Sequence, residues 1–171
     1  SFAWARRLLG RTTGYNAARL YQFCRLIDDL ADDDDHDHSA ELQALKQAVL
    51  GDIEHGHPIY ADLSDLIMET HLPRPVLAAL IDGLIADQQT VLFAREDELI
   101  RYGYHVAGTV GLLMCPVLGC HDRRAFAFAV DLGIAMQLTN IARDVLDDAK
   151  MGRRYLPAEW VAGLTPEQII A

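Results

Sequence analysis

Two segments of the sequence place aspartates four residues apart, the spacing that stacks side chains on one face of a helix. The first segment holds Asp28 and Asp32, and the second holds Asp144 and Asp148. Like charges at this spacing destabilise an isolated helix by about 0.2–0.5 kcal/mol. A divalent cation is the obvious compensation, so both segments predict a metal site.

Further polar residues extend both pairs along the same helix faces. Arg25 lies three residues before Asp28, and Tyr21 lies four residues before Arg25. The second stripe consists of Gln137, Asn140, Asp144 and Asp148, with Arg143 beside it. Mg²⁺ binds oxygen ligands and usually bridges carboxylates to substrate phosphates. The stripes therefore suit a Mg²⁺ site that also contacts a phosphate group.

Apolar residues cover most of the remaining circumference of the second segment, namely Ile134, Met136, Leu138, Ile141, Val145 and Leu146. A helix that is apolar on nearly every side is expected to be buried. Its polar stripe should then face an internal cavity, where carboxylates need partners.

The elements that position these residues are predicted to be helices throughout. Apolar residues recur at helical spacing, and no segment alternates over the length of a strand. The predicted helices are residues 3–9, 15–33, 40–53, 59–70, 75–89, 96–118 and 123–149. Pro116 should kink or end its helix, and Thr165-Pro166-Glu167 is a further helix start. We predict one all-α domain, residues 1–171, that is incomplete at both termini.

Composition excludes several other classes of protein. With 171 residues and a net charge of −10, the chain is unsuited to binding nucleic acid through a basic face. Glycines, a threonine and a proline interrupt the longest apolar stretch, residues 106–120, so no membrane span is predicted. Three cysteines without a CxxC motif indicate buried thiols in a reducing compartment, and we expect the cytoplasm.

Simpler explanations than a metal site also exist for these motifs. A single DxxxD pair on a helix is most often a solvated face, but two such pairs, each with an arginine beside it, favour a site. A calcium-binding loop starting at Asp33 fails, because His38 replaces the required glycine and Ala44 the required glutamate. The pairs His36/His38 and His55/His57 lie in predicted loops without a nearby cysteine, which favours exposed histidines over zinc.

Taken together, the motifs resemble the squalene/phytoene synthase family along the whole chain and in the family's order. They are Ser1-Phe2, Tyr21-xxx-Arg25-xx-Asp28-Asp29-xx-Asp32, Leu80-Ile-Asp-Gly83 with Asp87, the stretch YGYHVAGTVG from Tyr102 to Gly111, Gln137-xx-Asn140-xx-Arg143-Asp144-xxx-Asp148, and GRRYLP from Gly152 to Pro157.

The resemblance implies an isoprenoid-synthase-type helical bundle around a central cavity, with the two aspartate motifs facing each other across its mouth. Family members bind two prenyl diphosphates through a Mg²⁺ cluster, for which Mn²⁺ is an alternative, and join them head to head. By resemblance, the metals and diphosphates are held by Asp28, Asp32, Asn140, Asp144 and Asp148. The resemblance also places Tyr21, Arg25 and Arg143 on phosphate oxygens, Gln137 in the chamber wall and Tyr102 near the reacting carbons, as a cation stabiliser or proton relay. It counts Tyr102, Arg25 and the four paired aspartates among the catalytic residues.

Residues 131–144 and 154–160 look most like bacterial phytoene synthases. This likeness implies a prenyltransferase of carotenoid biosynthesis that joins two geranylgeranyl diphosphates through prephytoene diphosphate to phytoene, without NADPH. The C40 product leaves contact with a membrane surface open.

Other functions remain open at this point. The same motifs fit a synthase of squalene, presqualene diphosphate or dehydrosqualene that uses farnesyl diphosphate. DDxxD alone also fits head-to-tail elongation or terpene cyclisation, although NxxRDxxxD argues against both. A helical assembly factor without activity is more remote, because both aspartate motifs are intact. Gly108 and Gly111 indicate either room for an isoprenoid chain or close helix packing.

Overall fold

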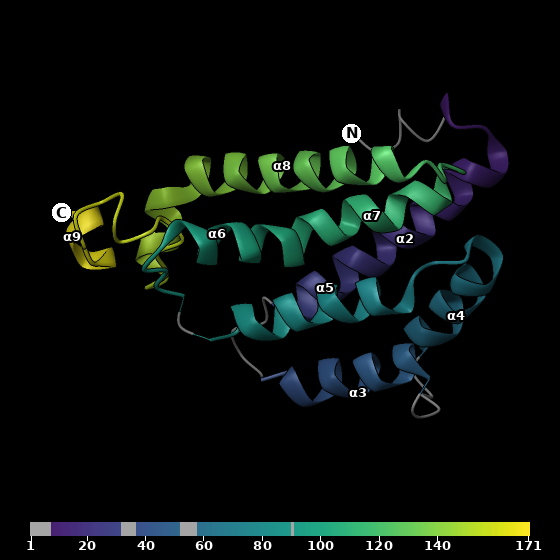
Figure 1. The fold of residues 1–171 in the computed structure, drawn as a ribbon. Coiled ribbons are helices and arrows are strands. Elements are labelled where there is room, and N and C mark those ends of the chain that lie inside the picture. Colours follow the sequence, from purple (N-terminus) through teal and green to yellow (C-terminus); the bar gives the residue numbers. More distant parts are fainter. Residues whose placement is uncertain (1–7, 32–36, 52–57, 90) are drawn as a thin grey trace.

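The protein is an assembly of helices without strands in the part of the chain that the structure, a computed structural model, describes: residues 8–31, 37–51, 58–89 and 91–171. The helices are α2 (Arg11–Ala31), α3 (Ser39–Leu50), α4 (Pro58–Thr70), α5 (Arg74–Asp87), α6 (Glu96–Gly103), the π-helical turn η1 (Tyr104–Gly108), α7 (Thr109–Val117), α8 (Arg123–Lys150) and α9 (Pro166–Ile170) (Figure 1). The predicted all-α class is confirmed.

Most predicted helix ends lie within a few residues of the observed ones, because they depend on local signals. Gly51 closes α3 in the left-handed region at φ 91°, and Thr165 caps α9 by accepting a hydrogen bond from the backbone of Gln168. Pro116 lies in the last turn of α7, as expected. Two predictions differ: α2 begins at Arg11 rather than at residue 15, and the expected helix 3–9 lies mostly outside the described residues.

The predicted helix 96–118 is a continuous run that contains the π-helical turn η1 between α6 and α7. A π turn adds one residue to a helical turn, and such turns often lie at functional sites. Apolar periodicity carries no signal for this extra residue, so the sequence did not indicate it.

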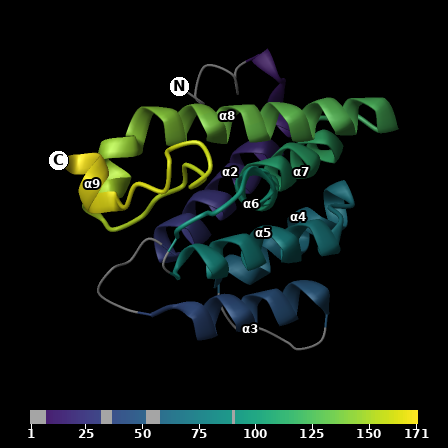
Figure 2. The same ribbon diagram turned by 60° about the vertical axis from the view of Figure 1, so that its left-hand side comes forward.

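The main hydrophobic core lies between α2, α3, α4, α5 and α7. Its fully buried side chains include Leu20, Ile27, Leu42, Leu63, Leu66, Leu77, Ile81 and Leu113. The helices α3, α5, the α6–η1–α7 run and α8 are stacked in that order, and α2 packs across α4, α5 and α7 (Figures 1 and 2). The core therefore holds α2 and α5 in place, together with α7, which continues the run that begins with α6.

The expectation that the second aspartate helix is buried is wrong for this chain. Only Ile141 and Ala149 of α8 are buried. The apolar side chains of Phe128, Leu132, Met136 and Leu146 are each more than half exposed. The physical reason is position, because among the described helices α8 is the outermost of the stack, with α6, η1 and α7 on its inner side and α9 near its C-terminal end (Figure 1).

The exposed length of α8 also bears on the membrane prediction. By length and composition, α8 is apolar enough to cross a membrane, although no span was predicted. The prediction considered only residues 106–120 as a candidate. The second aspartate motif occupies the C-terminal part of this same helix.

Glycines set how closely α8 approaches its neighbours. A Cβ atom at Gly111 would collide with the carbonyl of Ala129, and one at Gly133 would collide with the carbonyl of Ala107. At Gly108 an added Cβ would lie 3.2 Å from the ring of Tyr104 and 3.3 Å from Val130. Of the two interpretations of Gly108 and Gly111, the contacts support close helix packing, against side chains at Gly108 and against backbone at Gly111.

Candidate active site

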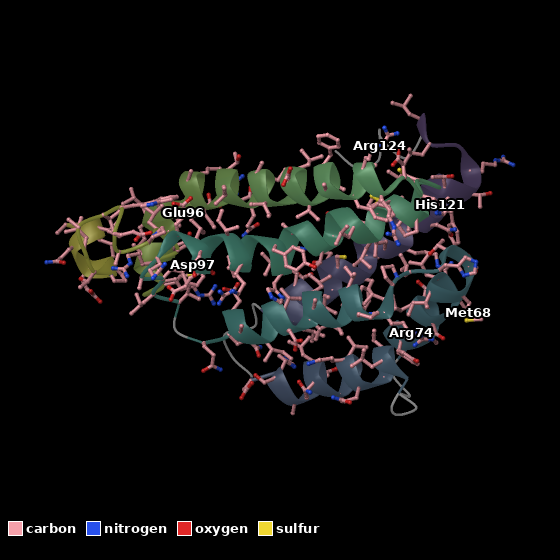
Figure 3. The ribbon with its side chains drawn as sticks, in the orientation of Figure 1. Met68, Arg74, Glu96, Asp97, His121 and Arg124 are labelled. Atoms are coloured by element: carbon pink, nitrogen blue, oxygen red, sulfur yellow. The ribbon has the colours of Figure 1, made fainter. Side chains whose placement is uncertain are left out.

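A cavity of about 320 Å³ lies where α2, α5 and α6 meet the C-terminal half of α8. Its lining residues are Asp28, Asp87, Tyr102, Gln137, Asn140, Ile141, Asp144, Asp148, Met151, Arg153 and Tyr155. The cavity is at the end of the stack marked by Glu96 and Asp97 in Figure 3, whereas His121 and Arg124 mark the opposite end. One cavity thus brings together side chains of both aspartate motifs.

Six of the predicted site residues line this cavity, and they come from three helices. Asp28 is on α2, Tyr102 is on α6, and α8 provides Gln137, Asn140, Asp144 and Asp148. The spacing of three and four residues that defined the α8 stripe is what turns these four side chains to the same side.

Three of the other four predicted residues do not line the cavity. Tyr21 and Arg25 are on α2, about half exposed or more, and Arg143 is exposed on α8. Arg25 binds the carboxylates of Asp28 at 3.2 Å and Asp29 at 2.8 Å. Asp32 lies outside the described residues.

Charged neighbours act in opposite directions on the two α8 aspartates. Arg143 donates from Nε and Nη2 to the two oxygens of Asp144, at 2.7 and 2.6 Å. These hydrogen bonds hold the pKa of Asp144 below its usual range. Partial burial raises the pKa of Asp148, repulsion from Asp144 adds to the rise, and Arg153 opposes it.

Aromatic residues form the wall of the cavity around Asp87. Tyr102 donates its hydroxyl to Asp87 Oδ2 at 2.9 Å, and Tyr155 donates to Oδ1 at 2.8 Å. The two tyrosine rings lie 5.0 Å apart, and Phe93 packs against both at 5.5 and 5.8 Å between ring centroids. Together with Val91, Leu99 and Ile141, these residues form a second, smaller hydrophobic cluster.

A model of the squalene/phytoene synthase family matches residues 1–171. The chain belongs to this family. It is 40% identical to a phytoene synthase of Pseudescherichia vulneris and 36% identical to the 15-cis-phytoene synthase of Pantoea ananas. Both alignments include the whole of this chain but only 60% of each relative, so the chain spans about three-fifths of their length.

Two solved structures of related enzymes have the same fold. A crystal structure of a dehydrosqualene synthase with a ligand superimposes with a TM-score of 0.83 at 30% identity, over 100% of this chain and 62% of that one. Squalene synthase HpnC from Alicyclobacillus acidocaldarius gives 0.81 at 27% identity, over 96% of this chain and 65% of that one. The fold is therefore that of the helical synthases of this family.

The cavity offers the ligand chemistry that a squalene/phytoene synthase site for Mg²⁺ would need. Asp28, Asn140, Asp144 and Asp148 provide only carboxylate and amide oxygens, which suit Mg²⁺ or Mn²⁺ rather than a softer metal. Within the described part of the chain, no three acidic, histidine or cysteine side chains are close enough to hold one ion. The donors therefore fit in type, and further oxygens must come from elsewhere, as substrate phosphates do for Mg²⁺.

The alternative zinc site receives no support from the described residues. His38 contacts the carboxylate of Glu41 at 3.1 Å near the start of α3, and His36, His55 and His57 lie outside the described residues.

Sequence reasoning did not select three of the polar residues that line the cavity: Asp87, Arg153 and Tyr155. Each belongs to a family-like segment, yet periodicity alone could not reveal a contact between residues 87 and 155. A buried arginine makes that contact possible. Arg154 donates to the carbonyls of Phe93 at 2.9 Å and Leu164 at 2.7 Å, while its backbone pairs with Val91 and Phe93. This pairing carries Phe93 and Tyr155 to the ring of Tyr102.

Proposed function

We propose that the protein is a prenyltransferase that condenses two geranylgeranyl diphosphates head to head, through prephytoene diphosphate, to phytoene. One observation carries the proposal: Asp28 of α2 and Asn140, Asp144 and Asp148 of α8 line a single cavity. The similarity to phytoene synthases over the whole chain supports the choice of product.

The charge distribution around the cavity suits the departure of diphosphate from an allylic carbon. Diphosphate leaves readily only when its negative charge is neutralised, and this effect is largest where water is excluded. Mg²⁺ held by Asp28, Asn140, Asp144 and Asp148 would supply charge neutralisation at the diphosphate oxygens. Mn²⁺ is the alternative ion, and Asp32 remains a predicted member of this ligand set.

The arginines of the two motifs have a separate part in the proposal. Arg25 and Arg143 each bind an aspartate of their own motif, which fixes the direction of those carboxylates. We assign both arginines, with Tyr21, to contacts with phosphate oxygens at the mouth of the cavity. Arg153 lines the cavity itself and adds positive charge there.

The tyrosines meet the second requirement of the reaction, which is to stabilise a carbocation intermediate. A cation placed over an aromatic ring is stabilised by about 0.5–2 kcal/mol, more where water is excluded. Tyr102 and Tyr155 provide such rings in the wall, and Gln137 lines the chamber beside them. A wall made of these residues suits a cationic intermediate, whereas a nucleophilic side chain in the same place would suit it less.

The test is to supply full-length protein with geranylgeranyl or farnesyl diphosphate, Mg²⁺, and NADPH or none, and to identify the hydrocarbon. We expect phytoene from geranylgeranyl diphosphate without NADPH. Squalene or dehydrosqualene from farnesyl diphosphate would instead favour the second candidate, for which the structural similarity to a dehydrosqualene synthase speaks. No consumption of either substrate would overturn the proposal.

A matched pair of variants tests the metal-binding stripe in the same assay. Asp144→Ala removes a carboxylate that lines the cavity, and we expect at least a ~100-fold loss of rate. Asp147→Ala is the control, because Asp147 lies on the same helix turn, is 74% exposed and pairs with Lys150 outside the cavity. Equal losses in the two variants would contradict the assignment.

We further propose prenyl diphosphates as the substrate class and the cytoplasm as the compartment.

A further inference from the structure

Asp87 uses both of its carboxylate oxygens to hold hydroxyl groups from two distant segments. Its Oδ2 accepts from Tyr102 of α6, and its Oδ1 accepts from Tyr155 in the turn after α8. Hydrogen bonds to an ionised acceptor are stronger and more directional than those between neutral groups. The carboxylate therefore connects α5, α6 and the turn after α8 at the cavity wall.

These hydrogen bonds determine what the two tyrosines can offer to a ligand. A phenol has a single O–H proton, and here both protons are donated to Asp87. Burial, then the negative charge of Asp87, raises the pKa of Tyr102 and of Tyr155 above the usual value, so both phenols keep their protons. Toward the cavity they can present oxygen lone pairs and ring faces, which attract positive charge.

Rigid elements hold Asp87 itself in place. It is the last residue of α5, and one turn earlier Gly83 lies so close to η1 that an added Cβ would be 2.7 Å from the Cβ of His105. The Nδ1 atom of His105 also lies 2.9 Å from the carbonyl oxygen of Ala79. These contacts tie the end of α5 to the residues that directly follow Tyr102.

We propose that Asp87 is a positioning residue that commits both tyrosine hydroxyls to itself and thereby presents Tyr102 and Tyr155 to a carbocation in the cavity. The inference rests on the proposed function for its substrate. The proposal assigns two roles within the cavity. The stripe on α8 binds the diphosphate, whereas the two tyrosines held by Asp87 stabilise the cation.

The activity test uses Asp87→Asn and Tyr102→Phe, singly and together, in the full-length protein. Misplaced reacting groups cost about 100-fold in rate, so we expect Asp87→Asn to lower kcat by about that factor. The KM for prenyl diphosphate and the Mg²⁺ concentration that gives half the maximal rate should stay within about twofold, because in this proposal Asp87 binds the two tyrosines rather than the metal or the diphosphate. The double variant should be no slower than the slower single variant, since both changes break one unit.

Two results would overturn the inference. A tenfold rise in the half-maximal Mg²⁺ concentration with little change in kcat would identify Asp87 as a metal ligand instead. If the fold-losses in kcat of the two single variants multiply in the double variant, Asp87 acts independently of Tyr102. Asp82→Asn is the matched control, because Asp82 is on the same helix but binds Lys46 at 2.7 Å and does not line this cavity. Tyr155→Phe gives a milder test that keeps the carboxylate and should also lower kcat at unchanged KM.

A measurement without substrate keeps this inference separate from the proposed function. Denaturant unfolding of the wild-type protein, the variants Asp87→Asn and Tyr102→Phe, and the double variant gives the coupling between Asp87 and Tyr102. We expect this coupling to be at least about fivefold in the unfolding equilibrium constant. If the wild-type protein makes no hydrocarbon but the coupling is present, the proposed function fails and the hydrogen-bonded unit stands. If the coupling is absent, the inference fails even in an active enzyme.

Discussion

The two helices that carry the aspartate motifs contribute to one cavity but are packed very differently. α2 buries eight of its 21 residues and crosses three other helices, whereas α8 buries two of its 28 residues and packs on one side. α8 nevertheless aims a stripe of four polar side chains at the cavity, and α2 contributes Asp28. Placing a functional stripe therefore requires one well-fixed face of a helix, and burial of the whole helix is not needed.

Different contacts fix these two faces. Large side chains hold α2, and the buried Arg19 ties it to α4 by hydrogen bonds to Asp62 and Glu69. Backbone proximity at Gly111 and Gly133 holds α8 against η1 and α7, with few large side chains. The contrast between side-chain packing and backbone approach can be tested by substitution.

The largest expected difference is between two leucines. Leu20 of α2 is fully buried, and Leu20→Ala should lower the free energy of unfolding by about 2–5 kcal/mol. Leu132 of α8 is 63% exposed, and Leu132→Ala should change it by less than about 0.5 kcal/mol. Urea unfolding of this chain measures both. A large loss for Leu132→Ala in the full-length protein would show that residues beyond this chain cover α8.

The next effect concerns the backbone contact of α8. Gly133→Ala adds a methyl group against the carbonyl of Ala107, and overpacking of this kind costs about 1–3 kcal/mol. Gly103→Ala is the control, since its Cβ would lie at an ordinary 3.5 Å from Ile134. Thermal unfolding should therefore separate the two variants. Equal melting temperatures would contradict the close approach of α8 to η1.

A smaller difference is expected between the ion pairs of the two helices. Arg19 is 6% exposed and donates to Asp62 and Glu69. Arg19→Met should lower the free energy of unfolding by about 1–2 kcal/mol, and not by more, because the two partner carboxylates are half exposed. On α8, Lys150 and Asp147 are both mostly exposed, and Lys150→Met should cost less than about 0.5 kcal/mol. Unfolding at low and high salt provides the check, because only the loss at Lys150 should vanish in high salt.

The smallest effect is a pH dependence that separates stability from function. The folded-state pKa of Asp148 is raised, so its ionised form costs stability as the pH rises through that pKa. Asp148→Asn should therefore stabilise the metal-free protein slightly at neutral pH, by less than about 0.5 kcal/mol because the site is largely solvated. The gain should disappear below about pH 4, where Asp148 is protonated in both states. A gain that persists at pH 3 would contradict the assigned cause.

Much of the site could be predicted because it depends on local spacing. Residues that share a helix face are determined by their separation along the chain, so the stripes at Asp28 and at Asn140, Asp144 and Asp148 were identified before their surroundings were known. The helix ends at Gly51 and Thr165 were local in the same way, since a left-handed residue or a capping side chain acts on its own turn.

Tertiary structure alone decided which residues meet. The hydrogen bonds of Asp87 to Tyr102 and Tyr155 span 15 and 68 residues, and no local pattern encodes such a distance. Apolar periodicity gives the composition of a helix face but not whether another element covers it, which is why the burial of α8 was predicted wrongly. The sequence by itself determined the helices and the chemistry on their faces, because both depend on residues a few positions apart. The packing of distant segments determined the cavity, the carboxylate that holds two tyrosines, and the exposed side of α8.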